Sequence, residues 1–467
     1  MNVTAESGTA EDAMNDTSDS LQQEYGPPNR WRLLSLVALA YFVLIQHRLV
    51  IGYVQVPLTS ELGLSDSESG MLDTAFLIPY GISQLFVAYL SDRLQRRRVL
   101  AVSLLASSVC LFAMGFVGGF WQLVGLRVLL GFGQSASVPA IAGVMADCFT
   151  PKNRSTAVGI YNLSLNLAVV VVGTLGGGLA DLPNLVLPFE MLGVGELSGW
   201  RLALLVFGVT GGLASLLIAV VMSEPERTER KSSQGLGQQG AGLRATVLSV
   251  LKLRTFVLLA IVFGGFCVVD NAQNYWLARH YVEDFGMTNA DAGFFATIYY
   301  RPAAFLGLLV GGFVADRWAR RWVRGRMLVQ ILGITLWIPA LVVLGIAESR
   351  FVLAPTMVVI GLGYGFYVAN LWTTSFDVID PAARSTAIGL FNVIAVPAAF
   401  TSPFIGYLRD THGVELGQAI SGLSIVACLI VLALSVTAIV FLPRDYHGPL
   451  AVGKNGGLTR SENPRSQ

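Results

Sequence analysis

Charged residues are scarce in this sequence. Only 13% of its 467 residues are Asp, Glu, Lys or Arg, against about 25% in a typical soluble domain, and the formal net charge is +1. So small an excess gives no indication of nucleic-acid binding. The four cysteines have no CxxC spacing, so neither a disulfide framework nor a metal site is predicted, and no cofactor is expected. HExxH, GxSxG and P-loop patterns are absent, so no motif indicates an enzyme.

Apolar residues are abundant instead, at 54% of the chain, with a mean hydropathy of +0.61. A bilayer core about 30 Å thick requires roughly 20 apolar residues in each spanning helix. Twelve segments meet that requirement, which predicts an all-α polytopic membrane protein with 12 transmembrane helices. The predicted helices span residues 33–57, 70–90, 99–117, 121–146, 155–180, 200–222, 255–280, 290–314, 327–347, 352–376, 384–408 and 418–442.

Hydrophilic segments divide the chain. Residues 1–30 are rich in Ser, Thr, Asp and Glu and are expected to be a disordered tail without a cleavable signal peptide. Residues 223–254 contain SSQGLGQQGAG, which is typical of a flexible linker. With a second tail at 444–467, these boundaries predict an N-terminal half over 31–222 and a C-terminal half over 255–443, with six helices each.

Basic residues indicate the orientation. The connections at 58–69, 118–120 and 181–199 contain no Lys or Arg, whereas the alternate connections are rich in them. By the positive-inside rule, both termini and the linker are predicted to be cytoplasmic, in a protein of the cell (inner) membrane. The basic connections follow the second predicted helix (Arg93, Arg96, Arg97, Arg98), form the linker, and follow the eighth (Arg317, Arg320, Arg321, Arg324, Arg326).

The two halves contain repeated motifs. ADCFTPKNRSTAVGIYN, which starts at Ala146, is echoed by FDVIDPAARSTAIGLFN, in which Arg384 corresponds to Arg154. AYLSDRLQRR matches GFVADRWARR, in which Asp316 corresponds to Asp92. The two pairs of motifs have nearly the same separation along the chain, which predicts an internal duplication in which both halves have the same orientation.

The Asp-Arg loops resemble the signature loop of the major facilitator superfamily, with Ala88 in place of the signature Gly in the first copy. The resemblance implies two parallel six-helix halves with a substrate site between them and transport by alternating access. Charged residues in and near the repeats are then expected to form cytoplasmic gating contacts, the alternative being that they only set the topology. They are Asp92, Arg93, Arg97, Arg154, Asp316, Arg317, Arg321 and Arg384.

Within that superfamily, QHRLVIGYVQVPLTSELGLSDSESGMLDTAF and GLRVLLGFGQSASVPAIAGVMADCFTP resemble the anion:cation symporters. Arg48 and Arg127 fall on arginines of that branch. His47 replaces its acidic residue before the first Arg, and Gln134 stands where a Glu is common; the branch uses both positions for protons. Spinster-type lipid transporters share the Asp-Arg pattern of the first helix and a DLFTKN-like loop, here DCFTPKN, and are the alternative.

Three arginines are predicted to bind an anionic substrate. At about 1.5 Å per helical residue, Arg48, Arg127 and Arg301 lie deep in three predicted helices of both halves. A cation inside a membrane normally faces a cavity or a counter-charge, and a guanidinium binds carboxylates through paired hydrogen bonds. Arg127 has the alternative of bonding to backbone carbonyl groups, and Arg301 that of pairing with Asp270.

Asp270 is the only acid well inside a predicted helix, and we expect it to carry a proton during transport, with a static salt bridge as the alternative. His47 is a second candidate for proton coupling and a candidate for substrate binding; a packed ring is its alternative. Further candidates for substrate contact are Gln134, Asn274, Tyr367 and Asn370, each with helix packing as the alternative.

These observations predict a secondary-active transporter in the lipid bilayer that moves a small organic anion, such as a sugar acid or related carboxylate, together with H+. A Spinster-like carrier of lysolipids or sphingolipids, and a receptor or scaffold without flux, remain alternatives.

Overall fold

The computed structural model describes residues 28–91, 94–150, 153–186, 196–224, 243–379 and 383–445. The predicted tails lie almost wholly outside these residues, as does most of the predicted linker. The stretch SSQGLGQQGAG lies outside the described residues, and the last part of the predicted linker contains helix α12 (Leu243–Leu251).

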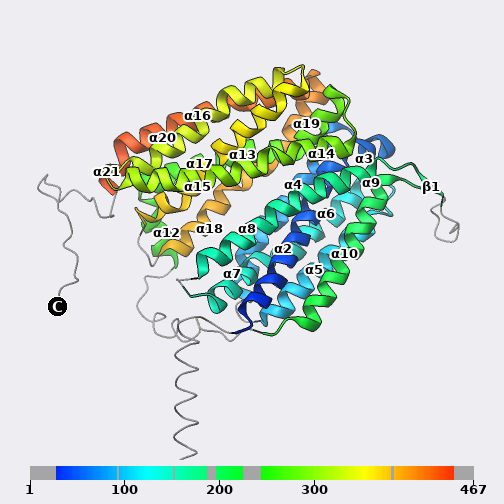
Figure 1. Ribbon diagram of the computed structural model, residues 1–467, viewed down its shortest axis with the longest axis horizontal. Helices are drawn as coiled ribbons and strands as arrows, with labels where there is room; N and C mark the ends of the chain where they lie inside the picture. Colours follow the sequence, from blue (N-terminus) through cyan, green and yellow to red (C-terminus); the bar gives the residue numbers. More distant parts are fainter. Residues whose placement is uncertain are drawn as a thin grey trace, which may run out of the picture.

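The N-terminal half is a helical bundle, coloured from blue to green in Figure 1. The 181–199 connection contains a short two-stranded antiparallel pair, in which Leu185 pairs with Leu197. The elements of this half are α2 (Arg30–Tyr53), α3 (Gln55–Leu62), α4 (Asp66–Ser91), α5 (Arg96–Met114), α6 (Phe120–Gln134), α7 (Ser137–Cys148), α8 (Arg154–Val171), the π-helix η1 (Val172–Gly176), α9 (Gly177–Ala180), β1 (Leu185–Val186), β2 (Glu196–Leu197) and α10 (Gly199–Val221).

The C-terminal half, coloured from green to red, forms the second bundle (Figure 1). Pro397, which lacks a backbone N–H, lies where the eleventh predicted helix becomes a 3-10 turn. The elements of this half are α13 (Arg254–Phe285), α14 (Asn289–Ile298), α15 (Tyr300–Ala319), α16 (Gly325–Ile346), α17 (Arg350–Phe376), α18 (Arg384–Ala395), the 3-10 helix η4 (Val396–Phe400), α19 (Thr401–His412), α20 (Leu416–Val436), the π-helix η5 (Thr437–Phe441) and α21 (Leu442–Asp445).

Eleven helical stretches of the described chain are long and apolar enough to cross a membrane. The remaining predicted span is α4, which is not among them and carries three acids near its start, Asp66, Glu68 and Asp73. Large apolar side chains are exposed on the outside of both bundles, as expected where lipid replaces water. The chain is therefore an integral membrane protein.

Small residues let helices within the C-terminal half approach closely. A Cβ atom on Gly361 would lie 2.4 Å from the backbone oxygen of Tyr300, and one on Gly307 would lie 2.5 Å from that of Leu362. The GxxxG spacings of α15 and α17 thus make a helix–helix interface, as such motifs do in membranes.

One ion pair occurs twice, at equivalent places in the two halves. Arg96 of α5 binds Asp147 of α7 at 2.9 Å, and Arg326 of α16 binds Asp377, next to the end of α17, at 2.6 Å. The interval along the chain from Arg96 to Arg326 equals that from Asp147 to Asp377. It is also the interval from Arg154 to Arg384 in the longer repeated motif. The structure thus places the repeated motifs in matching positions.

The two bundles converge at one end and diverge at the other (Figure 1). We call the end that carries Arg96–Arg98 and Arg317–Arg326 the basic end, and the end that carries α3, α9 and the start of α14 the opposite end. The bundles converge at the opposite end.

Candidate functional site

A cavity of about 230 Å³ lies between the two halves. Three arginines and two aspartates reach it from five different helices, which is a high density of charge for a membrane interior. Its lining comprises Tyr41, Ile45, Arg48, Leu49, Gly52, Asp73, Arg127, Leu165 and Val169 of the N-terminal half, and Asp270, Asn271, Asn274, Tyr275, Arg301 and Tyr364 of the C-terminal half.

Arg48, on α2, presents its guanidinium to this cavity. The group lies 5.5 Å from the ring centroid of Phe76 and 5.6 Å from that of Tyr80, so aromatic faces support the cation. Within the described chain, no carboxylate oxygen lies within 4.0 Å of it. Arg48 is therefore a cation with an aromatic platform and, among the described residues, no carboxylate at ion-pair distance.

Arg127, on α6, also lines the cavity, but its guanidinium is anchored to backbone. Its Nε donates to the carbonyl of Leu72 at 2.9 Å, and a terminal nitrogen donates to the carbonyl of Arg48 at 3.2 Å. This geometry is the alternative that the sequence left open. Arg127 thus contributes positive charge to the cavity and also fixes α2 against α4.

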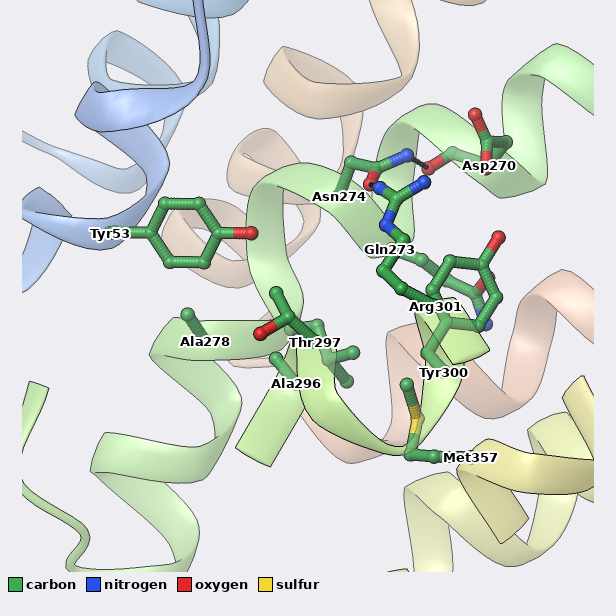
Figure 2. Close-up of a pocket in the computed structure, with 11 residues that line it drawn as sticks. Tyr53, Asp270, Gln273, Asn274, Ala278, Ala296, Thr297, Tyr300, Arg301 and Met357 are labelled. Carbon is green, nitrogen blue, oxygen red and sulfur yellow. Dashed lines mark hydrogen bonds between the residues drawn. The ribbon is translucent and has the colours of Figure 1, made fainter. Parts of the chain in front are cut away.

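Arg301 reaches the cavity from α15 and is held by an amide rather than by an acid. Its guanidinium donates to Oδ1 of Asn274 at 2.9 Å, and Nδ2 of Asn274 donates to the backbone carbonyl of Asp270 at 2.8 Å (Figure 2). In the described chain no Arg301–Asp270 ion pair falls within 4.0 Å. Asn274 thus connects the guanidinium of Arg301 to the backbone of Asp270, in a small side pocket that Tyr53 and Tyr300 also line.

Half of the predicted substrate-binding residues lie away from this cavity. His47 is fully buried inside the N-terminal half, where its ring nitrogens contact Ser107 Oγ at 3.2 Å and the carbonyl of Phe207 at 3.0 Å. Gln134 donates to the carbonyl of Leu44. For both, the structure shows the packing alternative.

Tyr367 and Asn370, on α17, pack within the C-terminal half in the same way. The ring of Tyr367 stacks on Phe266 at 4.4 Å, and Asn370 donates to the carbonyl of Phe366 at 2.9 Å. Tyr364, one turn earlier, is the residue of α17 that lines the cavity.

Asp73 is a cavity residue that the sequence analysis did not select. Its Oδ2 accepts hydrogen bonds from Asn271 Nδ2 and Ser402 Oγ, each at 2.8 Å. The sequence predicts a membrane-spanning helix that begins at residue 70, and this boundary puts Asp73 near the end of the helix. The available signal was the helix start at Asp66, which places Asp73 about two turns inside α4.

Among the described residues, no hydrogen bond or ion pair joins a predicted gating residue to the other half. The backbone N–H of Arg97 donates to Glu224 at 3.0 Å, and Asp316 binds Arg326 at 3.2 Å. Arg317 and Arg321 are exposed. Asp92 and Arg93, and the side chains of Arg154 and Arg384, lie outside the described part of the chain.

The opposite end carries an inter-half ion-pair network. Asp66 of α4 binds Arg279 of α13 at 2.6 Å and Arg409 of α19 at 2.7 Å. Both arginines also bind Glu283, at 2.6 and 2.9 Å. Charges from both halves therefore hold this end closed.

Helix N-termini at the opposite end are capped across the halves. Asp410 of the C-terminal half accepts from the backbone N–H groups of Asp66 and Ser67, at 3.0 and 2.8 Å, where α4 begins. Asp181 of the N-terminal half accepts from those of Asn289 and Ala290, at 3.0 and 2.8 Å, where α14 begins. Each half thus supplies a carboxylate to the free N–H groups and positive dipole end of a helix in the other.

The sequence model of the Major Facilitator Superfamily matches residues 37–396. The chain belongs to this superfamily. As a member of this transporter superfamily it is classed with membrane carriers rather than with enzymes, and the fold is the predicted one of 12 helices in two six-helix halves.

Several relatives are named as transporters of organic anions. A probable galactarate/D-glucarate transporter of Bacillus subtilis is 24% identical over 82% of this chain and 86% of its own. The cis,cis-muconate transport protein of Acinetobacter baylyi is 24% identical over 86% and 94%. A bacterial homolog of the human lysosomal transporter Spinster, in an inward-facing, unoccupied conformation, superposes with a TM-score of 0.74 at 21% identity over 91% and 99% of the two chains, which shows the shared fold.

Proposed function

We propose that this major facilitator superfamily protein is a secondary-active transporter of a small organic anion, a sugar acid or related carboxylate. The observation that carries the proposal is the guanidinium of Arg48, which faces a cavity between the halves without a carboxylate partner in the described chain. A ligand carboxylate would satisfy it through paired, charge-assisted hydrogen bonds. The galactarate/D-glucarate and muconate carriers among the relatives support the same ligand class.

The charges of the cavity favour an anion. Arg48, Arg127 and Arg301 outnumber Asp73 and Asp270 by one when all five are ionised, and by two when one of the acids carries a proton. A dicarboxylate that enters together with one proton brings that balance to zero, which lowers the cost of holding charge away from water. Arg301 and Asn274, from the other half, contact the far side of the ligand, so that the substrate bridges the two halves.

The proposed cycle is a rocking of the halves around this cavity. The basic end is taken as cytoplasmic by the positive-inside rule, with both termini on that side of the cell (inner) membrane. The opposite end, closed by Asp66, Arg279 and Arg409, then makes this an inward-facing conformation. Asp92, Arg93, Arg97 and Arg154 with Asp316, Arg317, Arg321 and Arg384 are the candidates for closing the basic end in the outward-facing conformation.

Asp270 is the proposed proton carrier of the C-terminal half. Asn274 connects it to Arg301, so a substrate carboxylate that attracts Arg301 alters the electrostatic environment of Asp270. Proton uptake at Asp270 and anion binding at Arg301 thus favour each other, which is the thermodynamic basis of symport.

Ligand-induced stabilisation of purified protein tests the proposal, with D-glucarate as the probe. A ligand at about one hundred times its Kd stabilises the folded state by about 2.7 kcal/mol. We expect D-glucarate to raise the Tm of the parent and not that of Arg48→Ala. Arg98→Ala, which removes an exposed arginine at the basic end, is the control and should respond like the parent.

Equal stabilisation of Arg48→Ala and the parent would refute the anion site. A response to a lysophospholipid, with none to D-glucarate or other small carboxylates, would replace the proposal by a Spinster-like lipid carrier. Proteoliposomes loaded with D-glucarate, in which the parent exchanges labelled substrate and Arg48→Ala does not, extend the test from binding to transport and exclude a receptor without flux.

A further inference from the structure

The side pocket beside the cavity is lined by residues of both halves. It shares Asp270, Asn274 and Arg301 with the cavity, and Tyr53, the last residue of α2, lines it from the N-terminal half. Because α2 ends at Tyr53 and α3 belongs to the opposite end, the pocket extends the cavity in that direction. Its free volume of about 20 Å³ is enough for about one water-sized group.

Close packing at the junction of the halves holds Tyr53 in place. A Cβ atom on Gly52, its neighbour in the chain, would lie 3.5 Å from the backbone oxygen of Asn274 in the other half. One on Gly173 of η1 would lie 3.2 Å from Cε1 of Tyr53. The residue is only 6% exposed. Its hydroxyl points into the side pocket, toward Arg301 (Figure 2).

Tyr53 and Arg301 bring hydrogen-bond donors to the side pocket that lack an acceptor. In the described chain, the hydroxyl of Tyr53 has no hydrogen-bond partner, and it interacts with Arg301 electrostatically. Nε of Arg301 is buried and, among the described residues, also without a partner; the guanidinium donates to Asn274 through a terminal nitrogen instead. Buried donors without an acceptor cost free energy. An oxygen atom of a ligand in this pocket would satisfy them.

The surroundings of the side pocket favour a carboxylate oxygen over a neutral hydroxyl. Hydrogen bonds strengthen when the acceptor is ionised, and a guanidinium adds its own charge. The hydroxyl of Thr297, which also lines the pocket, is engaged with the carbonyl of Gly293 at 2.9 Å. Asp270 lies on the far side of Arg301 from Tyr53 (Figure 2). It carries the coupled proton in the proposed function, so it does not repel a ligand carboxylate there.

We propose that Tyr53 and Arg301 form a second subsite, which binds the distal carboxylate of a dicarboxylate whose first carboxylate is held by Arg48. Tyr53 follows Arg48 on α2 and lies about 7.5 Å farther along the helix axis, at about 1.5 Å per residue. The ligand must therefore be long enough to extend from the cavity into the side pocket. This inference rests on the proposed function and narrows its substrate to an extended dicarboxylate, with Tyr53 as a residue that determines specificity.

Binding of three ligands to the purified parent and to Tyr53→Phe tests the second subsite. D-gluconate has the carbon chain of D-glucarate with a hydroxymethyl group in place of one carboxylate, and tartrate is a shorter dicarboxylate. We expect the parent to bind D-glucarate about tenfold or more tightly than D-gluconate, because only D-glucarate offers a charged acceptor at its distal end.

Tyr53→Phe removes the hydroxyl and keeps the ring. The Kd for D-glucarate should rise about tenfold, as expected for the loss of a hydrogen bond to a charged group, while those for D-gluconate and tartrate should stay within about threefold. Tyr407→Phe, the same substitution at an exposed tyrosine of α19, is the control and should match the parent for all three ligands.

Equal Kd values of the parent for D-glucarate and D-gluconate refute the second subsite, whether or not Tyr53→Phe folds. In Tyr53→Phe, an unchanged affinity for D-glucarate refutes it as well. So does an equal loss for all three ligands, which would mean that the hydroxyl supports the shape of the cavity and does not contact the distal carboxylate. If D-glucarate binding still depends on Arg48, the proposed function survives these results. No binding of D-glucarate to the parent would instead overturn the proposed function, and the second subsite with it.

Discussion

His47 and Arg48 are neighbours in the sequence but occupy different environments. Successive residues of an α-helix project about 100° apart, so the two side chains leave α2 on different faces. His47 points into the N-terminal bundle, toward Ser107 and Phe207, and Arg48 points into the cavity. One helix thus carries, side by side, a residue packed inside the N-terminal half and a residue that faces the cavity.

The two neighbours should give opposite phenotypes on substitution to alanine. His47→Ala removes a buried ring together with its contacts to Ser107 and to the carbonyl of Phe207, which we expect to cost about 2–4 kcal/mol and to lower Tm by several degrees. The Kd for D-glucarate should stay within about twofold, since a difference of about 1.4 kcal/mol is needed for a factor of ten. A thermal melt and a titration of the same sample give both values; a binding loss in His47→Ala without a fall in Tm contradicts the assignment.

The sequence could identify which residue types belong in the site more easily than which face of a helix they take. Arg48, Arg127, Arg301, Asn274 and Asp270 line the cavity, since charges inside a membrane have few other tolerable positions; their roles in binding and proton coupling stay predictions. For Tyr364 and Tyr367, on a helix that is apolar on most sides, no periodic pattern distinguishes the cavity face from the packed face. Asp73 was not selected because the apolar segment begins at residue 70, whereas helix α4 begins at Asp66.

At the scale of elements, the contact of η1 with α14 closes the opposite end by direct backbone approach. A Cβ atom on Gly293 of α14 would lie 2.0 Å from the backbone oxygen of Gly173, and one on Gly177 would lie 2.2 Å from that of Asn289. The GxxxG spacing of Gly173 and Gly177 therefore packs one half on the other, whereas the same spacing in α15 and α17 packs helices within a half.

Gly293→Ala should accordingly disfavour closure of the opposite end without weakening its own helix. Alanine is the better helix former by about 1 kcal/mol, so the cost of the substitution arises at the contact with Gly173. Spin labels on Trp121→Cys and Phe351→Cys, two exposed positions at the opposite end of the two halves, form a reporter pair whose separation increases when this end opens. For Gly293→Ala we expect the population with the longer label–label distance to increase. Gly212→Ala on α10 is the matched control, since a Cβ atom there meets nothing within 4 Å. Identical distance distributions for both variants would rule out the glycine contact as a determinant of closure.

For the whole molecule, the number of helices and the two halves follow from the sequence because lipid imposes a length and an apolar composition on every span. The internal duplication could also be predicted from the sequence. The ion pairs Arg96–Asp147 and Arg326–Asp377 occupy equivalent positions in the two halves. The cavity is different. In the register that aligns the two Asp-Arg loops, Asp73 corresponds to an uncharged residue in the second half, so the two copies differ at this position of the cavity lining. The repeated motifs therefore predict the two-half scaffold, whereas positions at which the two halves differ indicate the candidate site.

The duplication also explains why the closed end has two cross-half caps. The helix starts at Asp66 and Ala290 correspond to each other in the register of the Asp-Arg loops, and Asp181 and Asp410 are separated by nearly the interval of the longer repeat. Two copies of one helix-capping arrangement, exchanged between the halves, therefore hold the opposite end with twofold pseudosymmetry. Opening breaks both caps together, since each carboxylate and its helix start belong to different halves.

Asp181→Ala and Asp410→Ala should therefore shift the closed state by similar amounts. Loss of a carboxylate N-cap costs about 1 kcal/mol, which changes the ratio of open to closed molecules by about fivefold. The caps do not touch, so the double variant should show roughly the sum of the two free-energy shifts. Double electron–electron resonance on the reporter pair measures the ratio. The control is Asp291→Ala, an acid near the start of α14 that caps no described helix of the other half. An effect of Asp410→Ala alone would mean that only the α4–α19 contact sets the closure and that the exchanged caps are unequal.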